Sequence, residues 1–191
     1  DLDGQTLEAR LVVAADSRFS ETRRRLGIGA RMEDFGKTML VCRMAHERSH
    51  EQVAWEWFGY GQTLALLPLN GNCASAVLTL TPTEMNRVMS LDAEAFAREM
   101  ERRFDGRLGH MELVGERITY PLVGVYAERF AGLRSALIGD AAVGMHPVTA
   151  HGFNFGLQSQ KRLADALRDA LRRGKDIGDS TVLQRYAHAQ Q

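Results

Sequence analysis

Residues 135–156 read SALIGDAAVGMHPVTAHGFNFG, and this stretch decides the fold. The apolar residues 136–138 stop at Gly139 and Asp140, which is typical of a buried strand that ends in a glycine turn. From Asn154 the apolar residues follow a helical period, with three- and four-residue spacings among Leu157, Leu163, Ala164, Leu167, Ala170 and Leu171. The stretch therefore predicts a strand tipped by a carboxylate, then a loop, then a glycine-flanked helix N-terminus. Such a helix end suits an anion, or a carbonyl that becomes anionic.

A second strand end is predicted upstream. Residues 5–15 suggest two short strands or a strand pair, and residues 11–15, LVVAA, are apolar throughout. A run of this kind predicts a strand buried on both faces of a parallel sheet. Asp16 ends it, and two interpretations stay open: a turn carboxylate that caps the following amides, or a ligand contact. Ligands of α/β sheets collect at the carboxyl ends of strands, where Asp16 and Asp140 both lie.

The middle of the chain has another pattern. Turns centred on Tyr60 and Gly71 separate strands of an antiparallel meander, which we expect at residues 37–45, 52–58, 63–69 and 73–80. Residues 82–104 are expected to be helical, with Asp92 as an N-cap and a stripe that covers the sheet, made of Phe96, Met100 and Phe104. Strand returns at residues 110–119, and a further strand pair is expected at residues 123–130, with Pro121 marking an edge or crossover.

This order predicts an α/β domain interrupted by an inserted α+β domain. The expected boundaries are 1–34 for the first part of the α/β domain, 35–122 for the antiparallel sheet with its covering helix, and 123–191 for the return with a long helix. Ligands of the α/β part are expected where its strands end.

Composition excludes several classes of function. The chain has 191 residues with 24 basic and 24 acidic side chains, so charge gives no reason to expect nucleic acid as a partner. Residues 23–25, three arginines, are expected to form a solvated helix face. The isolated cysteines Cys42 and Cys73 indicate neither a metal site nor a disulfide framework, and they fit a reducing cytoplasm. No apolar run is long enough to span a membrane.

Two motifs carry a resemblance to a known family. Residues 139–142, GDAA, are followed by Pro147 and by Gly152-x-Asn154, and residues 11–23 read LVVAADSRFSETR. Together they resemble the second flavin-binding signature and the strand-plus-aspartate motif, ADGxxSxxR, of single-component aromatic hydroxylases built like para-hydroxybenzoate hydroxylase. The similarity is greatest to the ubiquinone-biosynthesis hydroxylase branch, and it covers nearly the whole chain.

The resemblance implies an FAD-binding, Rossmann-like α/β domain interrupted by a substrate domain. It implies a monooxygenase that hydroxylates an aromatic, phenolic or quinone-precursor substrate with FAD, NAD(P)H and O2 through a flavin C4a-hydroperoxide, and no catalytic side chain is required. In this family Asp140 would bind hydroxyls of the ribityl or ribose chain, and residues 152–154 would face the N1–C2=O edge of the flavin. The implied cofactor-binding residues are Asp16, Gly139, Asp140, Ala141, Pro147, Gly152, Phe153 and Asn154.

The implied substrate residues are Tyr120, Pro121 and Trp57. Trp57 has an alternative interpretation, because Trp55 and Trp57 alternate with Glu56 and a shared buried sheet face explains them equally well. The isolated cysteines predict a cytoplasmic parent protein, and peripheral membrane contact of that protein stays open.

The sequence departs from the family pattern at several positions. Ser17 replaces the glycine after the first aspartate, Val143 replaces a common histidine, and Ala150 and His151 stand where Gly and Gln or Gly are common. His146 and His151 are five residues apart with a proline between them, so a metal site is not expected.

No GxGxxG fingerprint occurs in the sequence, and we therefore expect a central-to-C-terminal fragment that binds FAD weakly or not at all on its own. Two alternatives to hydroxylation stay open. One is a related FAD-dependent reductase or halogenase, and the other is a flavin-free substrate or interaction module.

Overall fold

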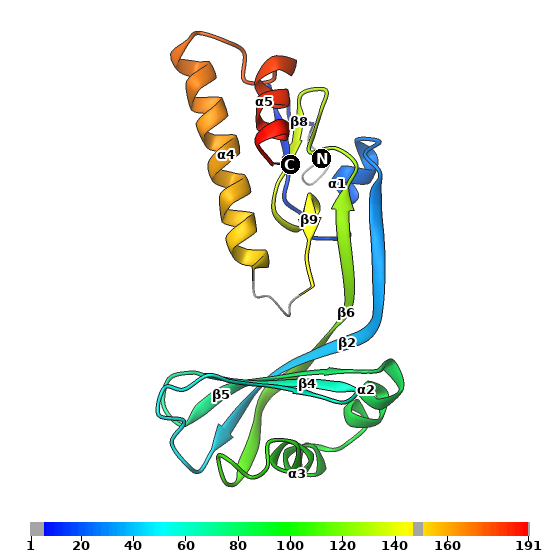
Figure 1. Cartoon of the computed structure of the whole chain (residues 1–191), viewed down its shortest axis with the longest axis vertical. Helices are drawn as coiled ribbons and strands as arrows, with labels where there is room; N and C mark the ends of the chain where they lie inside the picture. Colours follow the sequence, from blue (N-terminus) through cyan, green and yellow to red (C-terminus); the bar gives the residue numbers. More distant parts are fainter. Residues whose placement is uncertain (1–5, 147–150, 191) are drawn as a thin grey trace. The chain divides into compact units, whose positions relative to one another are not determined.

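The computed structural model describes residues 6–146 and 151–190, and in it the chain divides into two compact units. The first unit joins Asp1–Glu33 to Val123–Gln191, and the second is Asp34–Leu122 (Figure 1). The strands β2 (Ala30–His46) and β6 (Met111–Ala127) contribute residues to both units. The first unit is α/β and the second is α+β, as the order of strand and helix patterns predicted.

The second unit is built on an antiparallel sheet. β3 (Trp55–Gly59), β4 (Gln62–Pro68) and β5 (Cys73–Leu80) join β2 and β6, and with β9 (Val143–Gly144) of the first unit the strand order is β3-β4-β5-β2-β6-β9. In β5 buried and half-buried residues alternate along the whole strand. Because successive side chains point to opposite faces, this alternation assigns one face of the sheet to the core.

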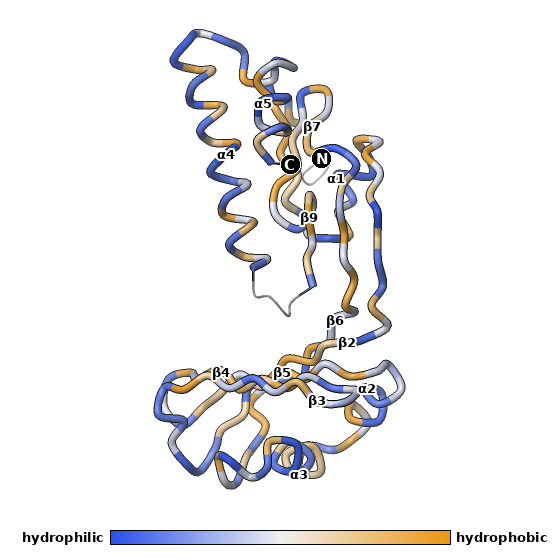
Figure 2. The backbone as a smooth tube through the Cα atoms, viewed as in Figure 1, coloured by the Kyte–Doolittle hydropathy of each residue, from blue (hydrophilic) through white to orange (hydrophobic). Residues whose placement is uncertain are grey.

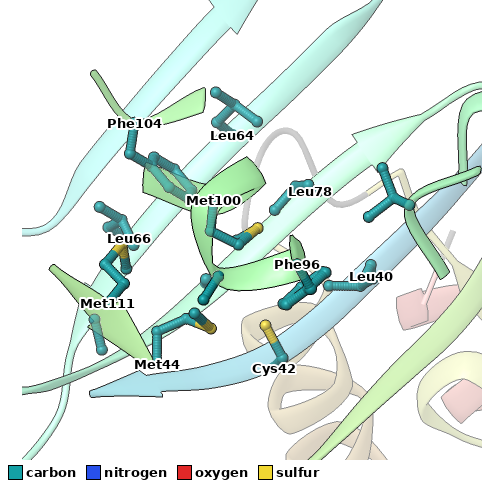
Figure 3. Close-up of a cluster of buried hydrophobic side chains, with 14 of the residues drawn as sticks. Leu40, Cys42, Met44, Leu64, Leu66, Leu78, Phe96, Met100, Phe104 and Met111 are labelled. Carbon is teal, nitrogen blue, oxygen red and sulfur yellow. The ribbon is translucent and has the colours of Figure 1, made fainter. Parts of the chain in front are cut away.

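Two helices cover that face. α2 (Pro82–Met89) begins at the N-cap Thr81, and α3 (Ala93–Arg103) begins at Asp92, whose Oδ1 accepts a 2.7 Å hydrogen bond from Ala95 N. The predicted stripe of α3 is fully buried, with side chains from β2, β4 and β5 around it (Figure 3). The stripe comprises Phe96, Met100 and Phe104.

Two expectations for the second unit and its borders were wrong. Residues 82–104 form two helices, because the chain turns at Ser90, where the backbone amide bonds to carbonyls of the last turn of α2. Residues 123–130 do not form a separate strand pair, because β6 continues through Pro121 as one strand from Met111 to Ala127. Pro121 is exposed. A strand tolerates proline at a position where the inter-strand hydrogen bonds do not need a backbone N–H donor.

The first unit contains the parallel strand pair that the sequence predicted. β1 (Val12–Ala14) pairs in parallel with β8 (Ser135–Leu137), and β7 (Ala131–Gly132) continues the sheet on the other side of β8. The short elements α1 (Glu21–Arg25), η1 (Gly139–Ala141) and β9 (Val143–Gly144) follow the strand ends.

The prediction that residues 11–15 are buried on both faces was wrong. Val12 and Val13 are 44% and 40% exposed, and of β1 only Ala14 is buried. β1 is the edge strand in the order β1-β8-β7, so in the described part of the chain its outer side has no neighbouring strand to cover it.

Two helices complete the first unit. α4 (Gly152–Arg172) begins where the sequence predicted, polar and apolar residues alternate along it, and α5 (Ser180–Gln190) packs beside it (Figures 1 and 2). Tyr186 on α5 is buried, and its hydroxyl donates to the carbonyl of Leu137 in β8 at 2.5 Å. Burial raises the pKa of Tyr186 to about 12. No helix in residues 6–146 and 151–190 is both long and apolar enough to cross a membrane.

Replacing Tyr186 by phenylalanine is expected to lower the free energy of unfolding by about 1–2 kcal/mol, because the Leu137 carbonyl loses its buried donor. Urea unfolding followed by circular dichroism measures the change. Tyr126→Phe is the matched control, since Tyr126 is 49% exposed, and it should leave the midpoint unchanged. Equal midpoints for the two variants would contradict the role of the buried hydroxyl.

Candidate functional site

The site lies at the carboxyl ends of β1 and β8. The register pairs Ala14 with Leu137, and Ile138 N donates to Ala14 O at 3.0 Å. The next residues of each chain segment, including Asp16 and Asp140, therefore leave the sheet at the same edge. Two carboxylates separated by most of the chain are thus brought to one site, as the two motifs predicted.

Asp16 organises its own loop. Its Oδ1 accepts from the hydroxyl of Ser20, and its Oδ2 accepts from Thr22 N at 3.0 Å. Burial acts to raise the pKa of Asp16, but the hydrogen bonds from Ser20 and Thr22 outweigh it and lower the pKa to about 2. The structure thus contains the contacts expected of a turn carboxylate that caps the following amides. Ser17 has a φ of 74°, a backbone conformation that favours the glycine of the family pattern.

Arg18 joins the two loops, and sequence reasoning missed it. Its Nη2 donates to Asp140 Oδ2 at 2.9 Å, and its Nη1 donates to the carbonyl of Val123 at 3.1 Å. The motif contained this residue, but no spacing singled it out, because its partner lies in a distant part of the sequence.

Arg23 corrects the prediction of a solvated arginine face at residues 23–25. It is only 3% exposed, and its Nη1 donates to the carbonyls of Ala141 at 2.9 Å and Arg18 at 3.3 Å. Burial lowers its pKa, and Asp16 opposes that effect. Arg23 thus fastens the loop after β1 to the turn after β8, whereas Arg24 and Arg25 are exposed.

The turn after β8 is held against α4. Gly139 has a φ of +57°, and its amide donates to Ser159 Oγ at 3.1 Å. The hydroxyl of Ser159, which is fully buried, donates to Gly156 O at 2.8 Å. A Cβ on Gly156 would lie 3.7 Å from the Cα of Gly139, so the two backbones pack closely. Sequence reasoning did not find Ser159, because its partner is a backbone amide.

In the described part of the chain, the N-terminus of α4 has no side-chain cap from its N-cap residue. That residue is His151, Phe153 is 76% exposed and Asn154 is also exposed. A Cβ built on Gly152 would have no neighbour within 4 Å, so space is open there. Uncapped amides beside open space suit a carbonyl or anion of a ligand. The predicted residue Pro147 lies outside the described residues.

The predicted substrate residues separate onto different faces of the second unit. Trp57 packs against Phe104 with ring centroids 5.5 Å apart, and the guanidinium of Arg107 lies 5.5 Å from its ring. The shared sheet face therefore accounts for Trp57. Tyr120 is 48% exposed and Pro121 is exposed. Successive side chains of β6 point to opposite faces of the sheet, and Tyr120 belongs to the set that points away from the core. It therefore lies on the face away from the helices.

That outer face of the second unit carries a cavity of about 460 Å³. Its walls are mostly apolar with charged residues among them, and they include Val41, Arg43, Leu69, Val114, Glu116 and Ile118. Val114 and Ile118 are 42% and 47% exposed, which adds an apolar stripe along β6 toward Tyr120. In the described residues no group of three or more His, Cys, Asp or Glu side chains could hold a metal ion.

Known proteins are similar to this chain in sequence and in fold. The family model described as "FAD binding domain" matches residues 1–191. Ubiquinone hydroxylase UbiM of Neisseria meningitidis is 53% identical over 186 residues, which are 97% of this chain and 40% of that protein. Ubiquinone hydroxylase UbiL of Rhodospirillum rubrum is 44% identical over 96% of this chain and 43% of its own length. The chain thus spans about two fifths of these curated relatives.

Solved structures agree in fold. PqsL, a probable FAD-dependent monooxygenase from Pseudomonas aeruginosa, superposes with a TM-score of 0.76 at 24% identity over 99% of this chain and 53% of that one. The flavin-dependent halogenase CmlS gives 0.74 at 20% identity, covering 94% of this chain and 34% of its own. The resemblance carried by the two motifs is confirmed, and the chain belongs to the family whose model is described as "FAD binding domain".

Proposed function

We propose that the full-length protein is an FAD- and NAD(P)H-dependent monooxygenase that hydroxylates a phenolic or quinone-precursor substrate. The observation that carries the proposal is the meeting of the strand ends that precede Asp16 and Asp140 at one sheet edge, where Arg18 binds Asp140 and Arg23 binds the carbonyl of Ala141. The relatives named as ubiquinone hydroxylases support the substrate class. Bound FAD would accept a hydride from NAD(P)H and activate O2.

The residues of this chain would hold the cofactor and tune its surroundings. Asp140 would accept a hydrogen bond from a hydroxyl of the sugar-alcohol chain, and Asp16 would set the shape of the adjoining loop. The turn at Gly139 and Ala141 would lie against the same chain, with Ser159 keeping the turn in place. The amides of Gly152, Phe153 and Asn154 at the start of α4 would stabilise negative charge on a carbonyl edge. Pro147 belongs to the same proposed set.

The outer sheet face would hold the substrate. Its cavity and apolar stripe match a ring that carries a hydrocarbon chain, as ubiquinone does, and Tyr120 with Pro121 would border the ring. Trp57 would act only through packing, since its ring contacts Phe104.

Spectroscopy and turnover test the proposal. The purified full-length protein should show flavin absorbance and should oxidise NAD(P)H faster when a phenolic substrate is added under O2. Mass spectrometry should find one oxygen atom added to the product. A halogenated product would point to a flavin-dependent halogenase, and a reduced product without oxygen insertion to a reductase. Absence of both bound flavin and NAD(P)H oxidation would leave the flavin-free module as the remaining function.

Val114→Asn is expected to raise KM about tenfold for a substrate with an isoprenoid chain, because the apolar contact between Val114 and that chain is lost, and to leave kcat unchanged. KM for the same phenol without the chain should stay constant. Val53→Asn is the matched control, since Val53 is 43% exposed but lies outside the cavity lining. Equal KM changes for both phenols would contradict a chain-binding role of this face.

A further inference from the structure

Arg18 is held at two points between the strand-end loops. Its guanidinium donates to Asp140 Oδ2 at 2.9 Å and to the carbonyl of Val123 at 3.1 Å. The side chains of Arg18 and Asp140 are 26% and 35% exposed. Ion pairs that are open to water contribute little to the free energy of folding, so the stability of the fold does not explain this pair.

The stem of Arg18 is also fixed. A Cβ built on Gly144 in β9 would lie 3.1 Å from the Cβ of Arg18, so the backbone of β9 approaches the stem closely. Gly144 is buried, and its missing side chain provides the room that this approach needs. The guanidinium therefore has a defined position relative to Asp140.

The two carboxylates of the site differ in how many of their oxygens accept hydrogen bonds from the described residues. Both oxygens of Asp16 accept hydrogen bonds inside their own loop, from Ser20 and Thr22. Asp140 has a partner only at Oδ2, and in residues 6–146 and 151–190 no donor is found for its Oδ1. Asp140 Oδ1 is thus the carboxylate oxygen that a ligand can use.

We propose that Arg18 is a positioning residue for FAD. It holds Asp140 by one oxygen, so that the other accepts a hydrogen bond from a hydroxyl of the cofactor's sugar-alcohol chain. It also neutralises the carboxylate, which would otherwise repel the diphosphate of FAD. The proposal rests on the FAD-binding role of Asp140 stated above.

FAD affinity of the full-length apoprotein tests this role. Titration with FAD, followed by quenching of flavin fluorescence, should give a Kd about tenfold higher for Arg18→Met, which keeps the apolar stem and removes the charge. Arg18→Lys should recover part of the affinity, because it restores the charge but not the two-point contact.

A double-mutant cycle separates action through Asp140 from direct contact with the phosphates. Once Asp140→Asn is present, Arg18→Met should change the Kd by no more than about twofold, because the residue that Arg18 positions has lost its charge. A full additional loss in the double variant would overturn the proposal, as would an unchanged Kd for Arg18→Met alone.

The control is Arg185→Met, which removes another arginine–aspartate pair, with Asp169 at 2.6 Å on α4. It should leave the Kd for FAD unchanged, and the melting temperature of the Arg18→Met apoprotein should fall no further than that of the control. If the unaltered protein binds no FAD, the proposed function fails. If it binds FAD and Arg18→Met binds equally well, only the role of Arg18 fails.

Discussion

Phe96→Ala is expected to lower the free energy of unfolding of the second unit by about 3–5 kcal/mol. Phe96 is fully buried in the apolar cluster under the sheet (Figure 3). Its ring centroid lies 4.8 Å from the guanidinium of Arg117. Alanine would leave a cavity and would remove the ring beneath that cation. Arg117 would keep its bonds to the carbonyls of Val88 and Leu91.

Tryptophan fluorescence during urea unfolding measures this loss in the second unit alone, because both tryptophans, Trp55 and Trp57, lie in β3. Phe58→Ala is the matched control, since Phe58 is 65% exposed and should shift stability by about 0.5 kcal/mol or less. Unchanged unfolding of Phe96→Ala would show that the α3 stripe does not hold the sheet and would favour a ligand-binding role for it.

Glu99→Gln is expected to lower the free energy of unfolding of the second unit by about 2–3 kcal/mol. Glu99 Oε1 lies 2.9 Å from Arg103 Nη2, and the two side chains are only 12% and 6% exposed. Arg87 and Arg102 reach the same carboxylate. Glutamine would leave a nearly buried guanidinium with Glu84 as its remaining ion-pair partner in the described residues.

The free energy of unfolding that Glu99→Gln removes should depend on pH. Hydrogen bonds from Arg102 and Arg87, with the charge of Arg103, lower the pKa of Glu99 from 4.5 to about 2. The unfolded chain therefore binds the proton first as the pH falls, so the contribution is complete above pH 4.5 and is lost toward pH 2. The difference between Glu99→Gln and the unaltered chain should shrink over that range.

The control for this prediction is Glu94→Gln on the same helix, because the Glu94 side chain is 85% exposed in its pair with Arg98. It should change stability by no more than about 0.5 kcal/mol at any pH. Equal effects of the two glutamine variants would mean that the network around Arg103 does not stabilise the unit.

The local sequence pattern predicted the strands and helices whose residues follow a regular spacing or a capping motif. The strand at residues 73–80, the cap at Asp92 and the helical period of α4 each depend on neighbours in the sequence, and each prediction is confirmed by the structure. Strand boundaries were less accurate, because β2 extends to Ala30 and β6 passes through Pro121, where cross-strand pairing overrides local turn signals.

The arginines show where sequence reasoning stopped. Residues 23–25 are three arginines that the charge pattern treated as one solvated face, although the ADGxxSxxR motif ends on Arg23, and the structure buries Arg23 and exposes its neighbours. Arg18 and Ser159 have no recognisable motif of their own, because their partners are Asp140, Val123 and the amide of Gly139. A donor whose acceptor lies in a distant segment leaves no local signal.

The sequence by itself determined two strands that end in aspartates and a helix that begins in glycine, since each is written in apolar runs and turn residues that act over a few positions. Only the tertiary structure decided which oxygens of those aspartates accept hydrogen bonds and which arginine binds Asp140. Those facts depend on the parallel pairing of β1 with β8, which brings Asp16, Arg18 and Asp140 together across most of the chain.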